Sequence, residues 1–264
     1  GSEAGMLKLK LPAAKSACGP LILVNRQHPL PDEAGKLYLD KCAEQLVPVS
    51  AADQEVRLQR AAACALMRLL QHLQAEQQLK PLSGFRSHQE QQELYASSLA
   101  EHGEAFTRQY VAWPGCSEHE TGLAIDMALV LPQINYLTPE FPYEGICQRF
   151  REAAAAYGFI EPYPQGKESI TGIGHEPWHF RYVGRPHAAL MSEKQLVLEE
   201  YLAFLHQATA EGKSFTTQAA GQQMRVSFIA AEPNHETIIQ VQGNTPYSVS
   251  GDNMGGFIIT EWEG

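Results

Sequence analysis

The sequence predicts an α+β fold, in which helices and short strands follow one another without an internal repeat. Apolar residues recur at helical spacing between about Ala52 and Leu79, which indicates a long amphipathic helix. Short apolar runs at Leu21–Asn25 and Leu123–Ala128 are of strand type. Beyond about residue 191 the chain becomes rich in Thr and Val and contains several turn signals, which predicts a small C-terminal α/β extension.

The chain up to His102 is expected to contain two helices and short strand segments. Leu21–Asn25 is one such strand. Ala52–Leu79 is rich in Ala, Leu, Gln, Glu and Arg and forms the first helix, which Pro81 stops. Leu82–Ser87 resembles the end of a strand followed by a turn, and His88–His102 has the composition of a second helix.

The middle of the chain alternates between turns and short elements. Trp113–Gly115 predicts a turn, and Leu123–Ala128 a buried strand that carries a single carboxylate. Gly145–Tyr157 is expected to be a helix that Gly158 closes at the C′ position. Glu176–Val183 ends in an alternating pattern that indicates another strand.

The C-terminal extension is expected to begin with a helix over Ser192–Ala210, with Ser192 as its N-cap. Turn signals then occur at Glu232–Asn234, at Gly243 with Asn244, and at Gly251–Asn253. They predict two or three antiparallel strands.

Length and composition exclude several classes of protein. A chain of 264 residues suffices for one large domain, or for a domain with a small appendage. Its formal charge of -10 argues against nucleic-acid binding, which needs clustered Lys and Arg. No apolar run approaches the ~20 residues of a membrane span. Gly1–Gly5 resembles the remnant of an expression tag rather than a signal peptide, and Met6 is a candidate native start.

The five cysteines are odd in number, widely scattered and without CxxC spacing, which argues against a zinc ribbon or a dense disulfide framework. Cys116 directly precedes a candidate metal motif. We interpret it as a small residue in a tight turn after Pro114 and Gly115 rather than as a ligand. The cysteines are Cys18, Cys42, Cys64, Cys116 and Cys147.

Asp126 interrupts an otherwise apolar strand. A buried charge without a partner is very costly, so this carboxylate needs a cation, a hydrogen-bond network or a metal ion. His119 lies seven residues upstream, across Gly122, which can supply a tight bend. These two residues alone leave open both a structural His–Asp hydrogen bond and a zinc site, since zinc accepts nitrogen and carboxylate ligands.

The segment from His175 to His179 formally matches the H-E-x-x-H pattern of helical zinc proteases. Pro177 in its middle would break such a helix, so we expect an extended or turn conformation instead. His179 is then a third metal ligand and Glu176 the base, and one coordination position stays open for water. The role of His175 stays open between contact with a ligand, contact with substrate and none.

Arg86 lies at a predicted strand-to-helix turn. Its guanidinium is suited to stabilise the oxyanion of a tetrahedral intermediate. Taken alone, it is equally consistent with a surface residue that caps the turn.

These segments together resemble the LAS metallopeptidases, and within them the D-alanyl-D-alanine carboxypeptidases related to vancomycin resistance. The pattern S-x-H-x-x-G-x-A-x-D is met by Ser117–Asp126, and E-x-W-H by Glu176–His179. Ser83–Ser87 matches S-G-[YF]-R-S. The resemblance covers roughly Leu21 to Arg185. The chain departs from the family at Cys116, Glu120 and Pro162, where Tyr, Thr or His, then Gln, and then Arg are more usual.

The resemblance implies a small central antiparallel sheet with flanking helices that holds one Zn²⁺ ion per chain. Residues 21–190 then form the catalytic domain, between an N-terminal segment (1–20) and a C-terminal helix and small β extension (191–264). The roles carried over are metal ligand for His119, Asp126 and His179, general base for Glu176, carbonyl polarisation for Arg86, and binding of the substrate's terminal carboxylate for Ser117 and Gln91.

The implied activity is that of a zinc-dependent D,D-carboxypeptidase, which removes the terminal D-Ala from peptidoglycan stem peptides ending in D-Ala-D-Ala. A D,D-dipeptidase, an L,D-carboxypeptidase or an endopeptidase of the same family stays an alternative. So does a module of another class, which binds zinc or peptidoglycan without turnover. The expected partner is a stem peptide or its precursor, and the oligomeric state is not predicted.

The compartment rests on opposing indications. The family resemblance favours the extracytoplasmic side, whereas the odd number of cysteines and the candidate start at Met6 favour the cytoplasm. We expect the cell envelope.

Overall fold

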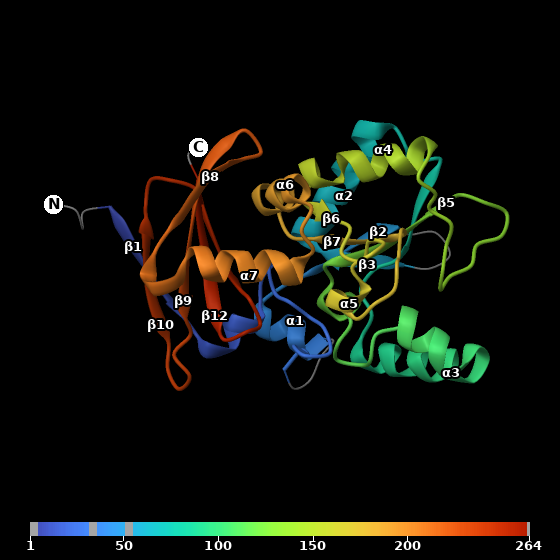
Figure 1. Cartoon of the computed structure of the whole chain (residues 1–264), viewed down its shortest axis with the longest axis horizontal. Coiled ribbons are helices and arrows are strands. Elements are labelled where there is room, and N and C mark those ends of the chain that lie inside the picture. Colours follow the sequence, from blue (N-terminus) through green and yellow to red (C-terminus); the bar gives the residue numbers. More distant parts are fainter. Residues whose placement is uncertain (1–4, 32–35, 51–54, 263–264) are drawn as a thin grey trace. The chain divides into compact units, whose positions relative to one another are not determined.

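The computed structural model describes residues 5–31, 36–50 and 55–262, and the chain divides into two compact units (Figure 1). Val24–Val197 forms one, which we call the central unit. Gly1–Leu23 and Leu198–Gly264 together form the other, which we call the terminal unit. Both contain helices and antiparallel strands, which confirms the predicted α+β class.

The central unit is built on a four-stranded antiparallel sheet with the strand order β4-β5-β7-β6. Its register places Asp126 opposite His179 and Ala124 opposite Arg181. Residues directly opposite each other in an antiparallel pair point to the same face, so these four side chains share one face of the sheet. The strands are β4 (Leu79–Ser83), β5 (Ala124–Leu129), β7 (His179–Tyr182) and β6 (Phe159–Ile160).

The other face of this sheet is apolar. Ile125, Met127 and Phe180 alternate with the polar positions, as strand geometry requires, and all three are fully buried. They belong to the same core as the apolar residues of α2 (Arg60–Leu73) and α4 (Gly145–Ala153), which lie together on one side of the sheet (Figure 1). One face therefore carries the core, and the other is left for polar groups.

The remaining elements of the central unit surround this sheet. The longest helix, α3 (His88–Tyr110), begins with a capping box formed by Ser87 and Glu90 and is kinked at Gly103. The others are α1 (Lys36–Cys42), a two-stranded sheet of β2 (Leu46–Ser50) and β3 (Val56–Gln59), the 3₁₀ helices η2 (Glu118–Thr121) and η3 (Ala154–Tyr157), α5 (Glu168–Thr171) and α6 (Arg185–Lys194).

The terminal unit joins the two ends of the chain in one small β structure. Strand β1 (Met6–Leu11) pairs antiparallel with β10 (Thr237–Gln242), and a second sheet has the order β11-β12-β9-β8. Its core contains Ile239, Val241, Phe257 and Ile259. Its other elements are η1 (Ala13–Ala17), α7 (Leu198–Ala208), η4 (Ala210–Gly212), β8 (Phe215–Ala219), β9 (Gln222–Ala230), β11 (Tyr247–Gly251) and β12 (Gly256–Trp262).

The prediction of a strand at Leu21–Asn25 is wrong. The segment is buried except for Asn25, but it belongs to no ladder. Its backbone donors have other partners, because the amide of Leu21 donates to Ser250 Oγ (2.9 Å) and that of Leu23 to the carbonyl of Asp252 (3.0 Å). This short apolar segment therefore finds partners for these backbone amides without being part of a sheet.

The prediction of one helix over Ala52–Leu79 is also wrong at both ends. Val56–Gln59 is strand β3, whose buried Val56 and Leu58 are spaced by two residues as in a strand, although Leu58 also lies four residues before the buried Ala62 of the helix. The helix itself ends at Leu73, where Gln74 adopts a left-handed conformation. Ala52 lies outside the described residues.

The predicted helix at Ser192–Ala210 is two helices. Ser192 lies inside α6 rather than at an N-cap, and the left-handed Gln195 (φ 54°) ends that helix before α7 begins. The described part of the tail contains the strands β8 to β12 rather than two or three, and one of them pairs with the N-terminal β1.

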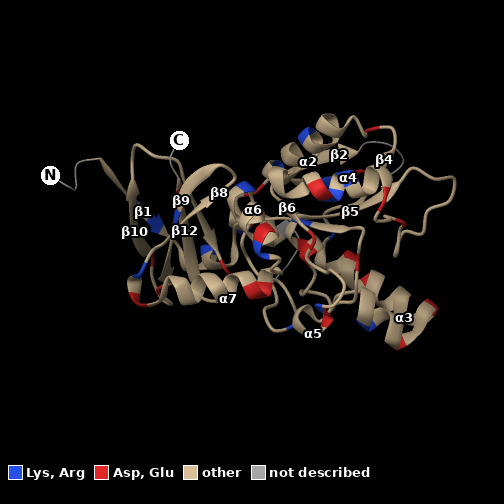
Figure 2. Ribbon diagram, turned by 45° about the horizontal axis from the view of Figure 1, so that its top comes forward, with Lys and Arg blue, Asp and Glu red and all other residues tan. Residues whose placement is uncertain are grey.

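Charged residues of both signs share the same helices of the central unit. Acidic and basic residues both occur along α3 and α4 (Figure 2). In the part of the chain that the structure describes, no helix is both long and apolar enough to cross a membrane.

Candidate active site

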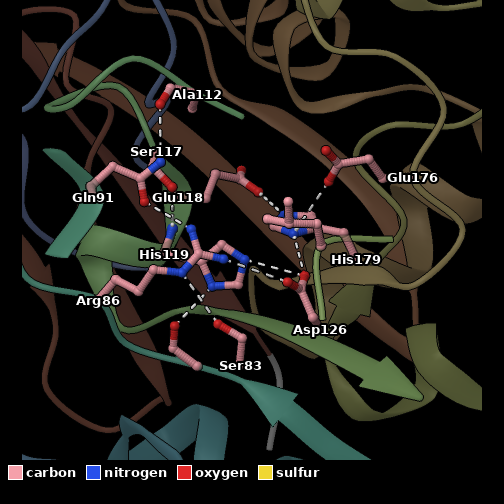
Figure 3. A network of polar contacts seen from close by, with 12 residues as sticks. Ser83, Arg86, Gln91, Ala112, Ser117, Glu118, His119, Asp126, Glu176 and His179 are labelled. Atoms are coloured by element: carbon pink, nitrogen blue, oxygen red, sulfur yellow. Dashed lines mark hydrogen bonds and ion pairs between the residues drawn. The ribbon is translucent and has the colours of Figure 1, made fainter. Parts of the chain in front are cut away.

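Three side chains from three different elements converge on the polar face of the central sheet (Figure 3). His119 comes from η2, Asp126 from β5 and His179 from β7, and their potential ligand atoms all lie within 4.8 Å of one another. Asp126 Oδ1 is 3.2 Å from His119 Nε2 and 3.0 Å from His179 Nδ1. All three residues are buried, so the structure brings together the three predicted metal ligands.

A tight turn aims His119 at the strand. Ser117 begins η2 with a capping box, in which its Oγ accepts a hydrogen bond from the His119 amide (3.2 Å) and Glu120 binds back to the Ser117 amide. Gly122 ends the turn in a left-handed conformation (φ 76°), which costs glycine little. The chain then runs directly into β5, which places Asp126 beside His119.

Each imidazole is held from the side that faces away from Asp126. His119 Nδ1 donates to the carbonyl of Gly84 (2.8 Å), and His179 Nε2 donates to Glu118 Oε1 (2.9 Å). In the neutral imidazoles the lone pairs of His119 Nε2 and His179 Nδ1 therefore both face the carboxylate. Two imidazole lone pairs that converge with a carboxylate attract a cation, and two nitrogens with one carboxylate oxygen suit zinc.

The electrostatics of the three residues indicate the same need for positive charge. Burial alone would raise the pKa of Asp126, but His119 and His179 lower it well below its usual range. Burial, together with the nearby Arg86, lowers the pKa of His119. Burial also acts to lower the pKa of His179, but its hydrogen bonds to Asp126 and Glu118 outweigh this effect and raise the pKa to about 10.

Glu176 lies next to this cluster, in the segment that leads into β7. Its Oε2 is 3.8 Å from His179 Nδ1, and its amide donates to the carbonyl of Tyr163 (3.0 Å). Burial raises the pKa of the Glu176 carboxyl to about 8, although His179 opposes this effect. A carboxylate of this basicity is suited to accept a proton near neutral pH.

The H-E-x-x-H pattern around Glu176 does not form a helix. Residues 174–178 have no helical conformation, as Pro177 predicts. His175 lies outside the cluster of potential ligands, and its Nε2 is 2.6 Å from the hydroxyl of Tyr143. One of the three roles left open for His175 was contact with a metal-binding residue, and the structure does not show such a contact.

Arg86 reaches the cluster from the other side. Its amide donates to the carbonyl of His119 (3.0 Å), and its guanidinium NH2 lies 3.6 Å from Asp126 Oδ2. The guanidinium also donates to Ser83 Oγ (3.3 Å) and to Gln91 Oε1 (2.8 Å). Burial lowers the pKa of Arg86, while Asp126 and Glu176 favour its charged form.

The two predicted substrate-binding residues differ in position. Ser117 lines the pocket over the cluster, whereas Gln91 is completely buried. The side-chain amide of Gln91 accepts from Arg86 and donates to the carbonyl of Ala112 (2.9 Å), so in this structure it positions the arginine. Contact of Ser117 and Gln91 with substrate stays a prediction.

The pocket over the cluster is narrow, with a volume of about 40 Å³. Charged groups at its base meet a wall of largely apolar and aromatic side chains, an arrangement typical of small-molecule sites. This wall contains Leu94, Tyr110, Val111, Tyr136, Leu137, Tyr163, Ile173 and Trp178. The ring of Tyr163 also stacks on His179, with ring centroids 4.8 Å apart.

Two residues that the sequence analysis left without a role are part of this site. Glu118 binds His179 through one carboxylate oxygen and Arg181 through the other. No motif singled out Glu118 or Arg181, although Arg181 lies two residues after His179 in a predicted strand and so shares its face.

Cys116 is free and buried, and it does not belong to the metal-binding group, as the sequence analysis expected.

Comparison with known proteins identifies the family. A family model described as VanY, D-alanyl-D-alanine carboxypeptidase, matches residues 55–185. The bifunctional D-Ala-D-Ala dipeptidase and D-Ala-D-Ala carboxypeptidase VanXYC of Enterococcus gallinarum is 40% identical over 200 residues, which are 72% of this chain and 97% of that protein. The chain belongs to the VanY family of D-alanyl-D-alanine carboxypeptidases. The predicted resemblance is thereby confirmed.

Solved structures agree with this assignment. The vancomycin resistance D,D-dipeptidase VanXYg, in complex with a D-Ala-D-Ala phosphinate analog, is 40% identical with a TM-score of 0.89, and the match covers 98% of this chain and 99% of that one. The vancomycin resistance D,D-pentapeptidase VanY in complex with Zn(II) is 30% identical with a TM-score of 0.56, over 69% of this chain and 98% of that one.

We predict that Glu176→Gln changes how the stability of the metal-free protein depends on pH. The folded protein holds the Glu176 proton up to about pH 8, whereas the unfolded chain releases it near 4.5. Glu176 therefore makes the free energy of unfolding decrease as the pH rises between these two values, because the folded protein binds one more proton there than the unfolded chain. Urea unfolding with a chelator, between about pH 5 and pH 8, should show a flatter dependence for the variant than for the wild type.

The matched control for this measurement is Glu144→Gln, since Glu144 is exposed and lies outside the pocket. It should follow the wild-type pH dependence. Identical slopes for wild type and Glu176→Gln would contradict a buried carboxyl of raised pKa.

Proposed function

We propose that this chain is a zinc-dependent D,D-carboxypeptidase that removes the terminal D-Ala from peptidoglycan stem peptides ending in D-Ala-D-Ala. The observation that carries the proposal is the convergence of two imidazole lone pairs and one carboxylate, with a buried Glu and an Arg beside them in one pocket. Membership of the D-alanyl-D-alanine carboxypeptidase family supports the substrate class.

His119 Nε2, Asp126 and His179 Nδ1 would hold the zinc ion, because these three atoms face one another while the far nitrogen of each ring is hydrogen-bonded elsewhere. When bound, zinc supplies Lewis acidity toward the attacking water and the scissile carbonyl. The VanY pentapeptidase in complex with Zn(II) is a relative with this ion.

Glu176 would act as the general base. Its carboxylate lies at the edge of the three ligands, 3.8 Å from His179 Nδ1, so it can reach a water molecule placed beside them. It takes the proton of this water as the peptide carbonyl is attacked, and then returns a proton to the amine of the leaving D-Ala. Burial raises its proton affinity, which suits both transfers.

Arg86 would stabilise the negative charge that develops on the carbonyl oxygen. Gln91 and Ser83 hold its guanidinium, and Asp126 balances part of its charge. A preoriented cation in a site with little water stabilises an oxyanion strongly, because no reorganisation is needed during the reaction.

A second activity, D,D-dipeptidase, is favoured by one observation. The dipeptidase VanXYg matches this chain over 98% of its length, terminal unit included, whereas the VanY pentapeptidase matches 69%. The relative VanXYC is named for both activities. We therefore propose free D-Ala-D-Ala as a further substrate.

We also propose that the chain acts in the cell envelope, where cross-linked and nascent stem peptides are accessible. The support is the substrate class alone. The cytoplasm is the alternative, and it would fit hydrolysis of the free dipeptide or of a soluble precursor.

Glu176→Ala and His119→Ala should both abolish release of D-Ala from a pentapeptide ending in D-Ala-D-Ala. Loss of a general base costs about 10²–10⁴-fold in rate. Glu176→Ala should still bind one zinc ion per chain, whereas His119→Ala should lose most of it. The measurement is D-Ala release together with zinc content by atomic absorption. Undiminished turnover in Glu176→Ala would remove this residue from the role of base.

Substrate preference separates the family members. The wild-type protein with zinc should release D-Ala from the pentapeptide and should also hydrolyse free D-Ala-D-Ala, and a chelator should stop both reactions. Hydrolysis of only a tetrapeptide ending in L-Lys-D-Ala would instead show an L,D-carboxypeptidase. Bound zinc without turnover of any of these peptides would favour a binding module.

Fractionation of cells that naturally produce the protein tests the compartment. Immunoblots should find the chain in the envelope or secreted fraction, with a cytoplasmic enzyme as the marker for leakage. Recovery with that cytoplasmic marker would overturn the proposed location.

A further inference from the structure

Glu118 connects the metal-binding His179 to a buried arginine. Its Oε1 lies 2.9 Å from His179 Nε2, and its Oε2 lies 2.7 Å from the NH1 of Arg181. Glu118 is 3% exposed and Arg181 is completely buried. The two oxygens of one buried carboxylate therefore accept from an imidazole and from a guanidinium.

The sheet explains why both partners of Glu118 lie on the same side. His179 and Arg181 are separated by one residue in β7, so they project from the same face. Arg181 pairs directly with Ala124 in β5, whose small side chain leaves room on that face for the long arginine. The Nε of Arg181 donates to the carbonyl of Tyr182 (3.0 Å), which fixes its direction.

The charge of Arg181 determines what Glu118 can do. A carboxylate buried without a partner is costly, and the adjacent guanidinium keeps Glu118 in its ionised form. An ionised carboxylate has acceptors only, so it requires a hydrogen on His179 Nε2. The lone pair of His179 is then on Nδ1, which faces Asp126 and His119.

An uncharged hydrogen-bond donor in place of the Glu118 carboxylate would move the hydrogen of His179 to the other ring nitrogen. An amide NH₂ facing Nε2 would stabilise the other neutral tautomer, with its hydrogen on Nδ1. That hydrogen would point at Asp126 and occupy the position of the cation. His119 does not have this alternative, because a backbone carbonyl, that of Gly84, accepts from its Nδ1.

We infer that Glu118 and Arg181 are positioning residues of the zinc site: the buried ion pair sets the tautomer and the direction of His179 and thereby the zinc affinity. The inference rests on the proposed zinc-dependent function and deepens it. It concerns a pair that acts on the metal site through His179.

Glu118→Gln tests the inference, because it keeps the shape of the side chain and removes its charge. The zinc dissociation constant, measured by competition with a chromophoric chelator, should rise about 10–100-fold, as is typical when a partner of a metal-binding histidine is lost. The readout is metal affinity rather than turnover. An unchanged dissociation constant, within about threefold, overturns the inference.

The matched control is Asp252→Asn. Asp252 is a fully buried carboxylate that accepts from the amides of Met254 and Gly256, and it does not line the pocket. Its zinc dissociation constant should stay close to that of the wild type. An equal loss in both variants would show a general effect of buried charge and would overturn the specific role of Glu118.

A measurement on the wild-type chain covers the case in which Glu118→Gln does not fold. In protein labelled with ¹⁵N-histidine and loaded with zinc, the NMR signals of His179 should show a hydrogen on Nε2 and metal coordination through Nδ1. The opposite assignment overturns the inference. A wild-type chain that binds no zinc would overturn the proposed function and this inference together, whereas normal zinc binding and turnover with an unaffected Glu118→Gln would overturn only the inference.

Discussion

The pairing of Asp126 with His179 across β5 and β7 is the constraint on which the rest of the site depends. Because side chains alternate along each strand, this register sends Ile125, Met127 and Phe180 into the core and the polar residues to the opposite face. A slip by one residue would turn Asp126 or His179 toward the apolar core and the core residues of that strand toward the polar face. The hydrophobic core under the sheet therefore fixes the metal-binding geometry above it, although Ile125, Met127 and Phe180 do not line the pocket.

Charge balance is the second constraint. Asp126, Glu118 and Glu176 bring three carboxyl groups into a space with almost no water, and Arg86 and Arg181 bring two guanidinium groups. Each guanidinium is paired with a different carboxylate, so each stabilises it without occupying the space between the three ligands. The burial that makes unpaired charge expensive also makes the remaining attraction for a cation strong.

Much of the site could be predicted from the sequence, and less of the fold. Ser117–Asp126 and Glu176–His179 are short segments in which a turn or strand places each ligand, so local spacing was enough to find His119, Asp126 and His179. The contact of Glu118 with Arg181 joins residues 63 positions apart and depends on the sheet register, which no local pattern shows. Leu58 fitted a strand through Val56 and a helix through Ala62, and the strand partner that decided between them lies in β2.

The pairing of β1 with β10 gives this chain an unusual order of assembly. Met6 precedes the central unit in the chain and its partner Gln242 follows it, so the ribosome makes the whole central unit before the two strands can pair. At about 5–20 residues per second, β1 waits on the order of tens of seconds for its neighbour. The central unit is complete in sequence during this interval, and it can fold before the terminal unit. The terminal unit therefore completes its β1–β10 sheet only after the ribosome has made the central unit and β10.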